Sequence, residues 1–277
     1  MFAQEYKTLN NGVKMPVLGL GVYKSGADTK QAVLDALEIG YRHIDTAAFY
    51  KNEEQVGEAI RESGIPREEI FATTKCWCDD LKNHRQREAF ETSLKRLGLD
   101  YVDLYLMHWP VDSTLEESWQ VLEQIYQEGK ARAIGVSNCY PQYLERVLAV
   151  AQVIPAVNQV EAHPYLSQQP LKEICQRQGI AMEAWSPLGR GGVLHDPVIE
   201  SMANKYGKTQ AQIILRWEVQ EGWIVIPKSV HKERIQENAQ IFDFALTQED
   251  LKTIEGLNQD KHFGTTVESM AAKDWVI

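Results

Sequence analysis

The sequence predicts an α/β protein: a closed (β/α)8 TIM barrel with an N-terminal β-hairpin and a C-terminal extra helix. Eight short apolar runs, typical of buried strands, alternate along the chain with segments of helical period. Eight strand–helix units in about 260 residues fit a closed barrel better than an open sheet. No stretch rich in Pro, Gly or Ser divides the chain. We therefore predict a single domain over residues 1–277.

The elements follow one another in a regular order. Two short alternating runs around Asn11-Gly12 predict a hairpin over residues 5–16. Strands are predicted at residues 17–20, 43–45, 70–75, 102–108, 133–137, 156–161, 181–185 and 223–227. Helices are predicted at residues 29–40, 52–63, 85–97, 114–128, 141–151, 169–178, 198–206, 209–221, 231–241 and 247–257. Asn52 and Thr247 are the expected N-caps of their helices.

Composition excludes several kinds of protein. Of the 277 residues, 44% are hydrophobic and 25% charged, which is ordinary for a soluble globular chain. The net charge of −10 argues against a polyanion-binding surface. The N-terminus lacks a basic segment followed by an apolar run, and the four cysteines lack disulfide-framework spacing. We expect a cytoplasmic protein with no nucleic-acid or membrane partner, a monomer, with a dimer left open.

The predicted strand ends are unusually polar. The C-terminal face of such a barrel collects the residues at which strands end, and chemistry gathers there. The residues at these ends are Asp45, Lys75, His108, Ser137, Asn138, Glu161, Trp185, Ser186, Lys228 and Ser229.

Four residues near successive strand ends form a candidate catalytic set: Asp45, Tyr50, Lys75 and His108. A lysine beside a phenol favours phenolate and lowers the tyrosine pKa, while Asp45 would hold the ammonium in place. His108 can orient a substrate oxygen by donating to it. Such a group could protonate a carbonyl oxygen as negative charge develops on it. Alternatively, Asp45 and Lys75 form only a structural ion pair, beside ordinary loop residues.

These motifs resemble the aldo-keto reductase family from about residue 7 to residue 260. The resemblance rests on the segments Gly40-Tyr41-Arg42-His43-Ile44-Asp45-Thr46-Ala47, residues 102–110, Ile134-Gly135-Val136-Ser137-Asn138 and Ile226-Pro227-Lys228-Ser229 with Arg234. Within the family, the chain is most similar to bacterial reductases of 2,5-diketo-gluconate and of glyoxal or methylglyoxal. The resemblance implies that Tyr50 is the general acid, that Lys75 and Asp45 tune it, that His108 orients the carbonyl, and that hydride comes from NADPH.

A cofactor site must be built without a Rossmann loop, because no G-x-G-x-x-G follows the first strand. Lys228, Ser229 and Arg234 place two cations and a hydroxyl near a helix N-terminus, which suits an anion. A solvated basic helix end is the alternative. The resemblance implies a 2′-phosphate site there and hence NADPH over NADH. It implies further cofactor contacts from Ser137, Asn138, Gln159, Trp185, Ser186, Leu188, Val230, Glu237 and Asn238.

Aromatic residues near the strand ends predict the substrate pocket. Tyr23, Phe49, Trp77 and Trp109, with His108, are expected to line the carbonyl site, although such aromatics can equally be core packing. Bulky Phe49 should narrow the pocket, which favours small aldehydes, α-dicarbonyls or keto sugars. The tail from Lys261 is short, and Trp275 within it has no predicted place.

Two other functions compete with the reductase. One is a non-catalytic NADP(H)-binding barrel used as a sensor or interaction subunit, which would not need Tyr50 together with Lys75. The other is a metal-dependent hydrolase, for which only Asp45 and His108 offer ligands. Cys76 and Cys78 lack further zinc ligands, so no metal is expected. Cys139, next to Asn138, raises the hypothesis that oxidants affect activity.

Overall fold

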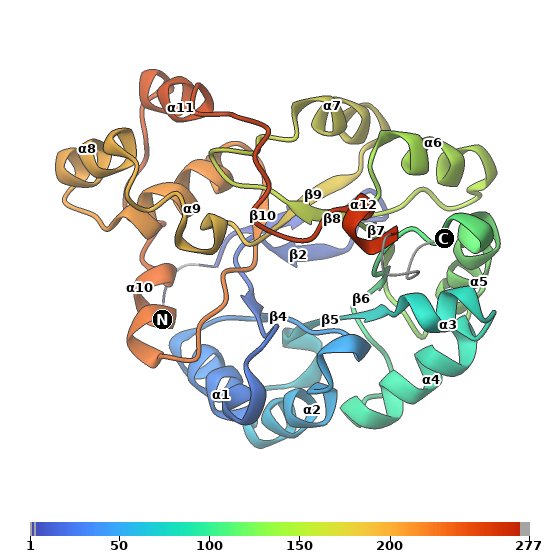
Figure 1. The fold of residues 1–277 in the computed structure, drawn as a ribbon. Helices are drawn as coiled ribbons and strands as arrows, with labels where there is room; N and C mark the ends of the chain where they lie inside the picture. Colours follow the sequence, from blue (N-terminus) through green and yellow to red (C-terminus); the bar gives the residue numbers. More distant parts are fainter. Residues whose placement is uncertain (1, 3, 272–277) are drawn as a thin grey trace.

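The barrel is the central feature of the computed structural model, which describes residue 2 and residues 4–271. Its parallel strands form one sheet and follow each other in chain order (Figure 1). The strands are β3 (Leu20–Gly21), β4 (His43–Asp45), β5 (Phe71–Cys76), β6 (Leu104–Met107), β7 (Ile134–Ser137), β8 (Val157–Glu161), β9 (Ala181–Trp185) and β10 (Ile224–Val225). The predicted TIM barrel is confirmed.

The barrel closes between its first and last strands through short contacts. Parallel bridges join Leu18 to Val225 and Gly21 to Lys228. The Gly19 N–H donates to the Val225 carbonyl at 2.9 Å. Gly21 is needed at this seam, because an added Cβ would lie 2.8 Å from the Ile226 carbonyl oxygen. The regular part of the first strand begins at Leu20, later than predicted, and the isolated bridge at Leu18 precedes it.

Helices surround the sheet on its outer side (Figure 1). They are α1 (Thr29–Ile39), α2 (Glu53–Glu62), α4 (Gln86–Leu97), α5 (Leu115–Gln127), α6 (Pro141–Val150), α7 (Gln169–Gln178), α8 (Pro197–Tyr206), α9 (Gln210–Gln220), α10 (Lys232–Ala239) and α11 (Gln248–Glu255). Each matches a predicted helix to within two residues at either end. The sequence did not predict α3 (Cys78–Lys82), α12 (Val267–Ala271) or the 3-10 turns η1 (Gly26–Asp28), η2 (Ala48–Tyr50), η3 (Arg67–Glu69), η4 (Asp112–Thr114) and η5 (Gly189–Gly191).

The two predicted caps behave differently. Thr247 begins α11 with a capping box, in which its hydroxyl accepts from the Asp250 N–H and the Asp250 side chain bonds back. Asn52 occupies the N-cap position of α2, but its side chain makes no capping hydrogen bond. Instead its amide nitrogen donates to the Val22 carbonyl at 2.9 Å, and its oxygen accepts from the Thr46 hydroxyl at 2.7 Å. Asn52 therefore holds the predicted N-cap position without the capping bond, and it ties the loop after β4 to the loop after β3.

The N-terminal hairpin closes the bottom of the barrel. Strands β1 (Tyr6–Thr8) and β2 (Lys14–Pro16) pair antiparallel, and Gly12 in their loop has a φ of +85°, in the left-handed region that glycine tolerates. Leu9 and Met15 pack against the lower ends of the barrel strands, including Phe71 and Leu106. Because this end is filled with apolar side chains, the opposite, C-terminal face is left for a site.

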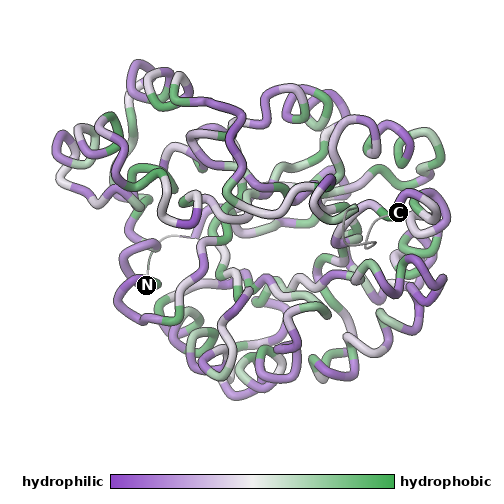
Figure 2. Tube along the Cα trace, viewed as in Figure 1, coloured by the Kyte–Doolittle hydropathy of each residue, from purple (hydrophilic) through white to green (hydrophobic). Residues whose placement is uncertain are grey.

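Apolar residues line the inner sides of the helices, and polar residues face outward (Figure 2). After α11, the chain crosses the barrel mouth and reaches α12 (Figure 1). We call residues 258–266 of this crossing the C-terminal strap. Trp275, left unplaced from the sequence, lies outside the described residues. No helix within the described part of the chain is both long and apolar enough to cross a membrane.

Candidate active site

The barrel mouth holds a buried ion pair directly below a phenol. Lys75, near the end of β5, is fully buried, and its Nζ donates to Asp45 Oδ1 at 2.7 Å and Oδ2 at 2.8 Å. It also donates to the Thr46 carbonyl at 2.8 Å and to Tyr50 Oη at 3.5 Å. Burial alone lowers the pKa of Lys75, but the neighbouring acidic groups, Asp45 foremost, together outweigh it and the net pKa is raised. The Lys75 ammonium is therefore charged and held in place by Asp45 and the Thr46 carbonyl.

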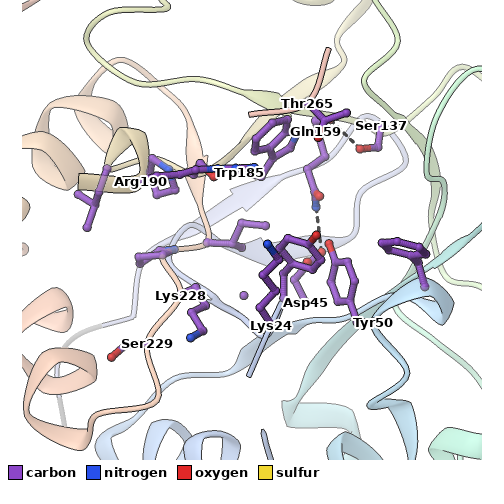
Figure 3. Close-up of a pocket in the computed structure, with 18 of the residues that line it drawn as sticks. Lys24, Asp45, Tyr50, Ser137, Gln159, Trp185, Arg190, Lys228, Ser229 and Thr265 are labelled. Carbon is purple, nitrogen blue, oxygen red and sulfur yellow. Dashed lines mark hydrogen bonds between the residues drawn. The ribbon is translucent and has the colours of Figure 1, made fainter. Parts of the chain in front are cut away.

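Tyr50 ends the 3-10 turn η2 and lies on the cavity wall beside Asp45 (Figure 3). Burial raises the pKa of Tyr50 to about 12, although Lys75 opposes this shift. Sequence reasoning predicted the opposite net direction from the lysine alone, and that prediction is wrong because desolvation of the phenolate dominates. At neutral pH the phenol keeps its proton.

His108 is held between aromatic rings at the end of β6. Its ring stands edge-on to Tyr50, with centroids 5.6 Å apart, and to Trp77 at 5.2 Å. Asn138 Nδ2 donates to the His108 carbonyl at 3.0 Å. Burial, followed by the nearby Lys75 charge, lowers the pKa of His108 well below its ordinary value. The ring is therefore neutral, with one nitrogen able to donate and the other able to accept.

Amide and hydroxyl groups form the opposite wall. Asn138 adopts a left-handed φ of +55°, and its Oδ1 accepts from Trp185 Nε1 at 2.9 Å, which fixes the indole plane. Gln159, on β8, donates from Nε2 to Asp45 Oδ2 at 2.8 Å (Figure 3). Ser137 Oγ donates to the Gln159 carbonyl at 2.9 Å. This wall thus offers an aromatic face next to several polar groups.

These groups open onto a cavity of about 720 Å³, within the range of ligand pockets. Lys24 and Lys228 lie on one side of it, and Arg190 lies on the opposite side (Figure 3). Arg234 also lines the cavity. Among the described residues, none of these four cations forms an ion pair or a side-chain hydrogen bond. A cavity with cations along one part and an indole, amides and a phenol along another fits the polar, phosphate-bearing and aromatic parts of a dinucleotide.

The structure gathers most of the predicted site residues into this cavity. They are Tyr23, Asp45, Phe49, Tyr50, Trp77, His108, Trp109, Ser137, Asn138, Gln159, Trp185, Ser186, Leu188, Lys228, Ser229, Val230 and Arg234. Lys75 lies beneath it. Glu237 and Asn238 lie outside its lining, and Glu237 Oε1 accepts from the Thr209 hydroxyl at 3.0 Å. Lys232, next to the basic cluster in sequence, pairs with Glu38 at 2.6 Å.

Sequence reasoning missed Lys24, Thr265 and Met270 as lining residues, and Arg190 lines the cavity as well. Lys24 and Arg190 have left-handed φ angles of +57° and +53°. Both follow strand ends in glycine-containing loops, and this signal was available in the sequence. Such backbone conformations are uncommon for residues with side chains and tend to be kept where geometry matters.

The C-terminal strap is docked on Glu161, at the end of β8. Its carboxylate accepts from His262 Nδ1 at 2.8 Å and from the Phe263 and Gly264 N–H groups at 2.9 and 2.8 Å. Burial alone would raise the pKa of Glu161, but the adjacent His163 ring and the hydrogen bonds from His262 and Phe263 lower it to about 2. Gly264 lies so close to Trp185 that an added Cβ would be 2.3 Å from the ring. The strap therefore covers the indole from outside.

The cysteines are free and buried. Burial raises the pKa of Cys76 to about 12 and raises the pKa of Cys139 further above its ordinary value. Reaction with oxidants needs an accessible thiolate, so this environment disfavours the hypothesis of an oxidant-sensitive Cys139. Within the described residues, no group of three or more potential metal ligands is found.

The fold and site together define a barrel enzyme with a protonated phenol on the wall of a cavity large enough for a ligand. The profile of the aldo/keto reductase family matches residues 17–259. Glyoxal reductase of Bacillus subtilis is 51% identical over 92% of this chain and 94% of its own length. The 9,11-endoperoxide prostaglandin H2 reductase of Trypanosoma cruzi is 49% identical over 93% of both chains. A Bombyx mori aldo-keto reductase, solved in complex with NADP, superposes with a TM-score of 0.91 at 38% identity over 98% of both chains.

The chain belongs to the aldo/keto reductase family. It is accordingly an oxidoreductase, as the motifs predicted. The family uses NADP(H), so the predicted cofactor is confirmed at the level of the family.

Proposed function

We propose that this protein reduces the carbonyl group of small aldehydes, α-dicarbonyls or keto sugars to an alcohol, with NADPH as the reductant. One observation carries the proposal: a protonated phenol, Tyr50, stands over the buried Lys75–Asp45 pair on the wall of a cavity that also fits a dinucleotide. A binding protein without chemistry would have no need of a buried ammonium 3.5 Å from a phenol.

The residues of the site divide the work of the reaction. Bound NADPH supplies the hydride to the carbonyl carbon. Tyr50 donates its proton to the carbonyl oxygen, and the neutral His108 ring donates a hydrogen bond that orients the same oxygen. Lys75 stabilises the phenolate that Tyr50 becomes, since its ammonium lies 3.5 Å from Oη. Asp45 keeps that ammonium charged and in place and does not itself transfer a proton.

The cofactor would lie between the cationic and aromatic parts of the cavity. Arg234 and Lys228 would bind the 2′-phosphate, because their charges are not paired with any carboxylate among the described residues, and the Ser229 hydroxyl would donate a hydrogen bond to it. Lys24 and Arg190 would face the pyrophosphate from two sides. Ser137, Asn138 and Gln159 would bind the carboxamide, and the Trp185 face would stack on the nicotinamide. Ser186, Leu188 and Val230 remain proposed contacts along the rest of the cofactor, and Glu237 and Asn238 remain proposed contacts beyond the cavity lining.

The pocket above Tyr50 favours small substrates. Phe49 stacks on Trp77 with ring centroids 3.8 Å apart, and both rings adjoin His108. Tyr23 packs on Tyr50 at 4.9 Å from the other side, and Trp109 completes the wall. Rigid stacked rings leave limited space at the phenol, which suits a short carbonyl compound. The glyoxal reductase of Bacillus subtilis, 51% identical, supports this substrate class.

Replacement of Tyr50 by phenylalanine tests the proposal. Tyr50→Phe should lower the rate of methylglyoxal reduction by at least about a hundredfold, a typical contribution of a positioned acid. NADPH binding, followed by quenching of tryptophan fluorescence, should remain within about twofold of wild type. Tyr6→Phe, which removes the hydroxyl of an exposed tyrosine outside the cavity, is the control. Wild-type turnover in Tyr50→Phe would remove the phenol from its role, and NADPH binding without turnover in the wild type would favour a sensor.

We further propose that the chain acts in the cytoplasm as a monomer and that residues 1–277 form one domain. The support for one domain is the eight-stranded barrel sheet, whose strands follow one another in chain order from β3 to β10.

A further inference from the structure

Glu183 is a buried acid that the reaction described above does not use. It lies on β9, two residues before Trp185, and its side chain is fully buried. On one side its backbone is paired with Gln159 of β8, and on the other side with Ile224 of β10. It therefore lies within the barrel beside Gln159, and it does not line the cavity.

Gln159 is held between two carboxyl groups. Its Nε2 donates to Asp45 Oδ2 at 2.8 Å and to Glu183 Oε2 at 2.7 Å. Because carboxylate oxygens accept hydrogen bonds, both protons of the amide are used below the cavity. The amide oxygen is consequently directed away from both acids. Since Gln159 lines the cavity, its oxygen is free to accept from a ligand amide there.

The charges around Glu183 determine its own state. The titratable groups that face it are Asp45, Lys75 and His43, whose Nε2 lies 3.5 Å from Glu183 Oε1. The single ammonium is already bound by both oxygens of Asp45. Burial, followed by the nearby Asp45 charge, raises the pKa of Glu183 to about 8. Burial lowers the pKa of His43 to about 3, so the ring is neutral and adds no charge.

The same geometry indicates which oxygen of neutral Glu183 carries the proton. Glu183 Oε2 accepts from Gln159, while Oε1 has no hydrogen-bond partner among the described residues and faces His43. A hydroxyl on Oε1 would point at that ring. Gly19 leaves room for the ring, because an added Cβ would lie 2.5 Å from His43 Nδ1. A neutral Glu183 that donates to the neutral His43 ring adds no second negative charge to the buried Asp45.

We propose that Glu183 is a positioning residue for the nicotinamide end of the cofactor: as a neutral acid it locks the amide of Gln159, and its ionisation above neutral pH places a second negative charge beneath that site. This inference rests on the proposed binding of NADP(H) in the cavity. The oxidised nicotinamide ring is positively charged and the reduced ring is neutral. Ionised Glu183 therefore favours NADP⁺ over NADPH, and the preference between the two forms depends on pH.

Measurements of NADP⁺ and NADPH binding test whether Glu183 ionises beneath the cofactor site. Dissociation constants of NADP⁺ and NADPH are measured from pH 6.5 to 9.5 by tryptophan fluorescence quenching. Both forms carry the same phosphates, so phosphate ionisation cancels in their ratio. In the wild type, the ratio of the NADPH constant to the NADP⁺ constant should rise about five- to tenfold as pH passes about 8. Glu183→Gln, which stays neutral, should give a flat ratio. Equal profiles in wild type and Glu183→Gln would overturn the proposal.

Glu218→Gln is the matched control. Glu218 is another fully buried glutamate with a raised pKa, but it lies on α9, outside the cavity lining. Its variant should keep the wild-type pH profile. A flat profile in Glu218→Gln as well would show that the change comes from global stability and would overturn the assignment to Glu183.

Infrared spectra of the cofactor-free protein at pH 7 separate this proposal from the proposed function. Glu183→Gln should remove a carboxylic-acid C=O band that wild type shows and that disappears as pH rises through about 8. A spectrum unchanged by the substitution would refute a neutral Glu183, whatever Tyr50→Phe does to turnover.

A comparison of single and double variants tests whether Glu183 acts by holding the Gln159 amide in place. Glu183→Leu should weaken NADPH binding about tenfold at pH 7, and adding it to Gln159→Leu should cause little further loss, since Gln159 mediates the effect. Independent, additive losses would contradict the positioning role. If Glu183→Leu does not fold, the Glu183→Gln pH profile and the infrared band still decide the proposal.

Discussion

Glu218 in α9 carries a carboxyl group whose two oxygens are buried and have no hydrogen-bond partner among the described residues. Burial raises its pKa well above the ordinary value of 4.5. A buried polar group without partners costs about 1–3 kcal/mol, and more when it is charged. At neutral pH the fold must either keep this acid protonated or hold an uncompensated charge, so Glu218 reduces stability.

We predict that Glu218→Met raises the free energy of unfolding by about 1–3 kcal/mol at pH 7.5. Because the folded pKa is raised, the wild-type penalty is smallest below the unfolded value of about 4.5 and grows as pH rises toward the folded pKa. The gain from the substitution should therefore be smaller at pH 4.5 than at pH 7.5. Urea denaturation at both pH values measures it. An equal gain at both would show that packing, not ionisation, causes the effect.

Residue types at strand ends were enough to predict Tyr50, Lys75, Asp45 and His108, because the ends of parallel strands meet at one face. The net pKa direction of Tyr50 was not predictable, since it depends on how completely other rings desolvate the phenol. Lys24 was missed for a related reason. Loop cations can point in any direction until the barrel is closed around them.

The C-terminal strap is the element whose position depends most on a single side chain. Glu161 accepts from two consecutive backbone N–H groups and from His262, and the chain at Gly264 rests on Trp185. Neither this path nor α12 was predicted. The segment has little periodicity, and its partners come from β8, about a hundred residues earlier, as the sequence separations of its hydrogen bonds show.

We predict that Glu161→Gln loosens the strap, because an amide presents an NH2 group where the carboxylate accepts several donors. Hydrogen exchange at the Phe263 and Gly264 amides should become at least about tenfold faster, and the barrel strands should keep wild-type protection. Wild type should show the same local loosening as pH falls from about 4.5 toward 2, since the folded pKa of Glu161 is lowered to about 2. Glu255→Gln, at the end of α11, is the control. Unchanged exchange in Glu161→Gln would show that ring packing alone holds the strap.

At the scale of the whole molecule, the periodic pattern predicted the barrel, the hairpin and the order of the helices. Each of these elements follows from local residue spacing. The closing seam was predicted less well, because its bridges depend on Gly19 and Gly21 meeting β10 from the other end of the chain. The first strand is shorter than expected for the same reason. The boundary of the domain at residues 1–277 stays a prediction.

The net charge of −10 contrasts with the four cavity cations that have no ion-pair partner among the described residues. A ligand that binds only the folded protein stabilises it, by about 2.7 kcal/mol at a hundred times its dissociation constant. Saturating NADPH should therefore raise the melting temperature by several degrees.

Arg234→Ala should lose most of that shift for NADPH and little for NADH, which lacks the 2′-phosphate. Arg87→Ala, which removes an exposed cation paired with Glu128, should keep the full shift. Added salt should reduce the NADPH shift more than the NADH shift, because exposed charges are screened. Equal losses for both cofactors in Arg234→Ala would place the 2′-phosphate elsewhere.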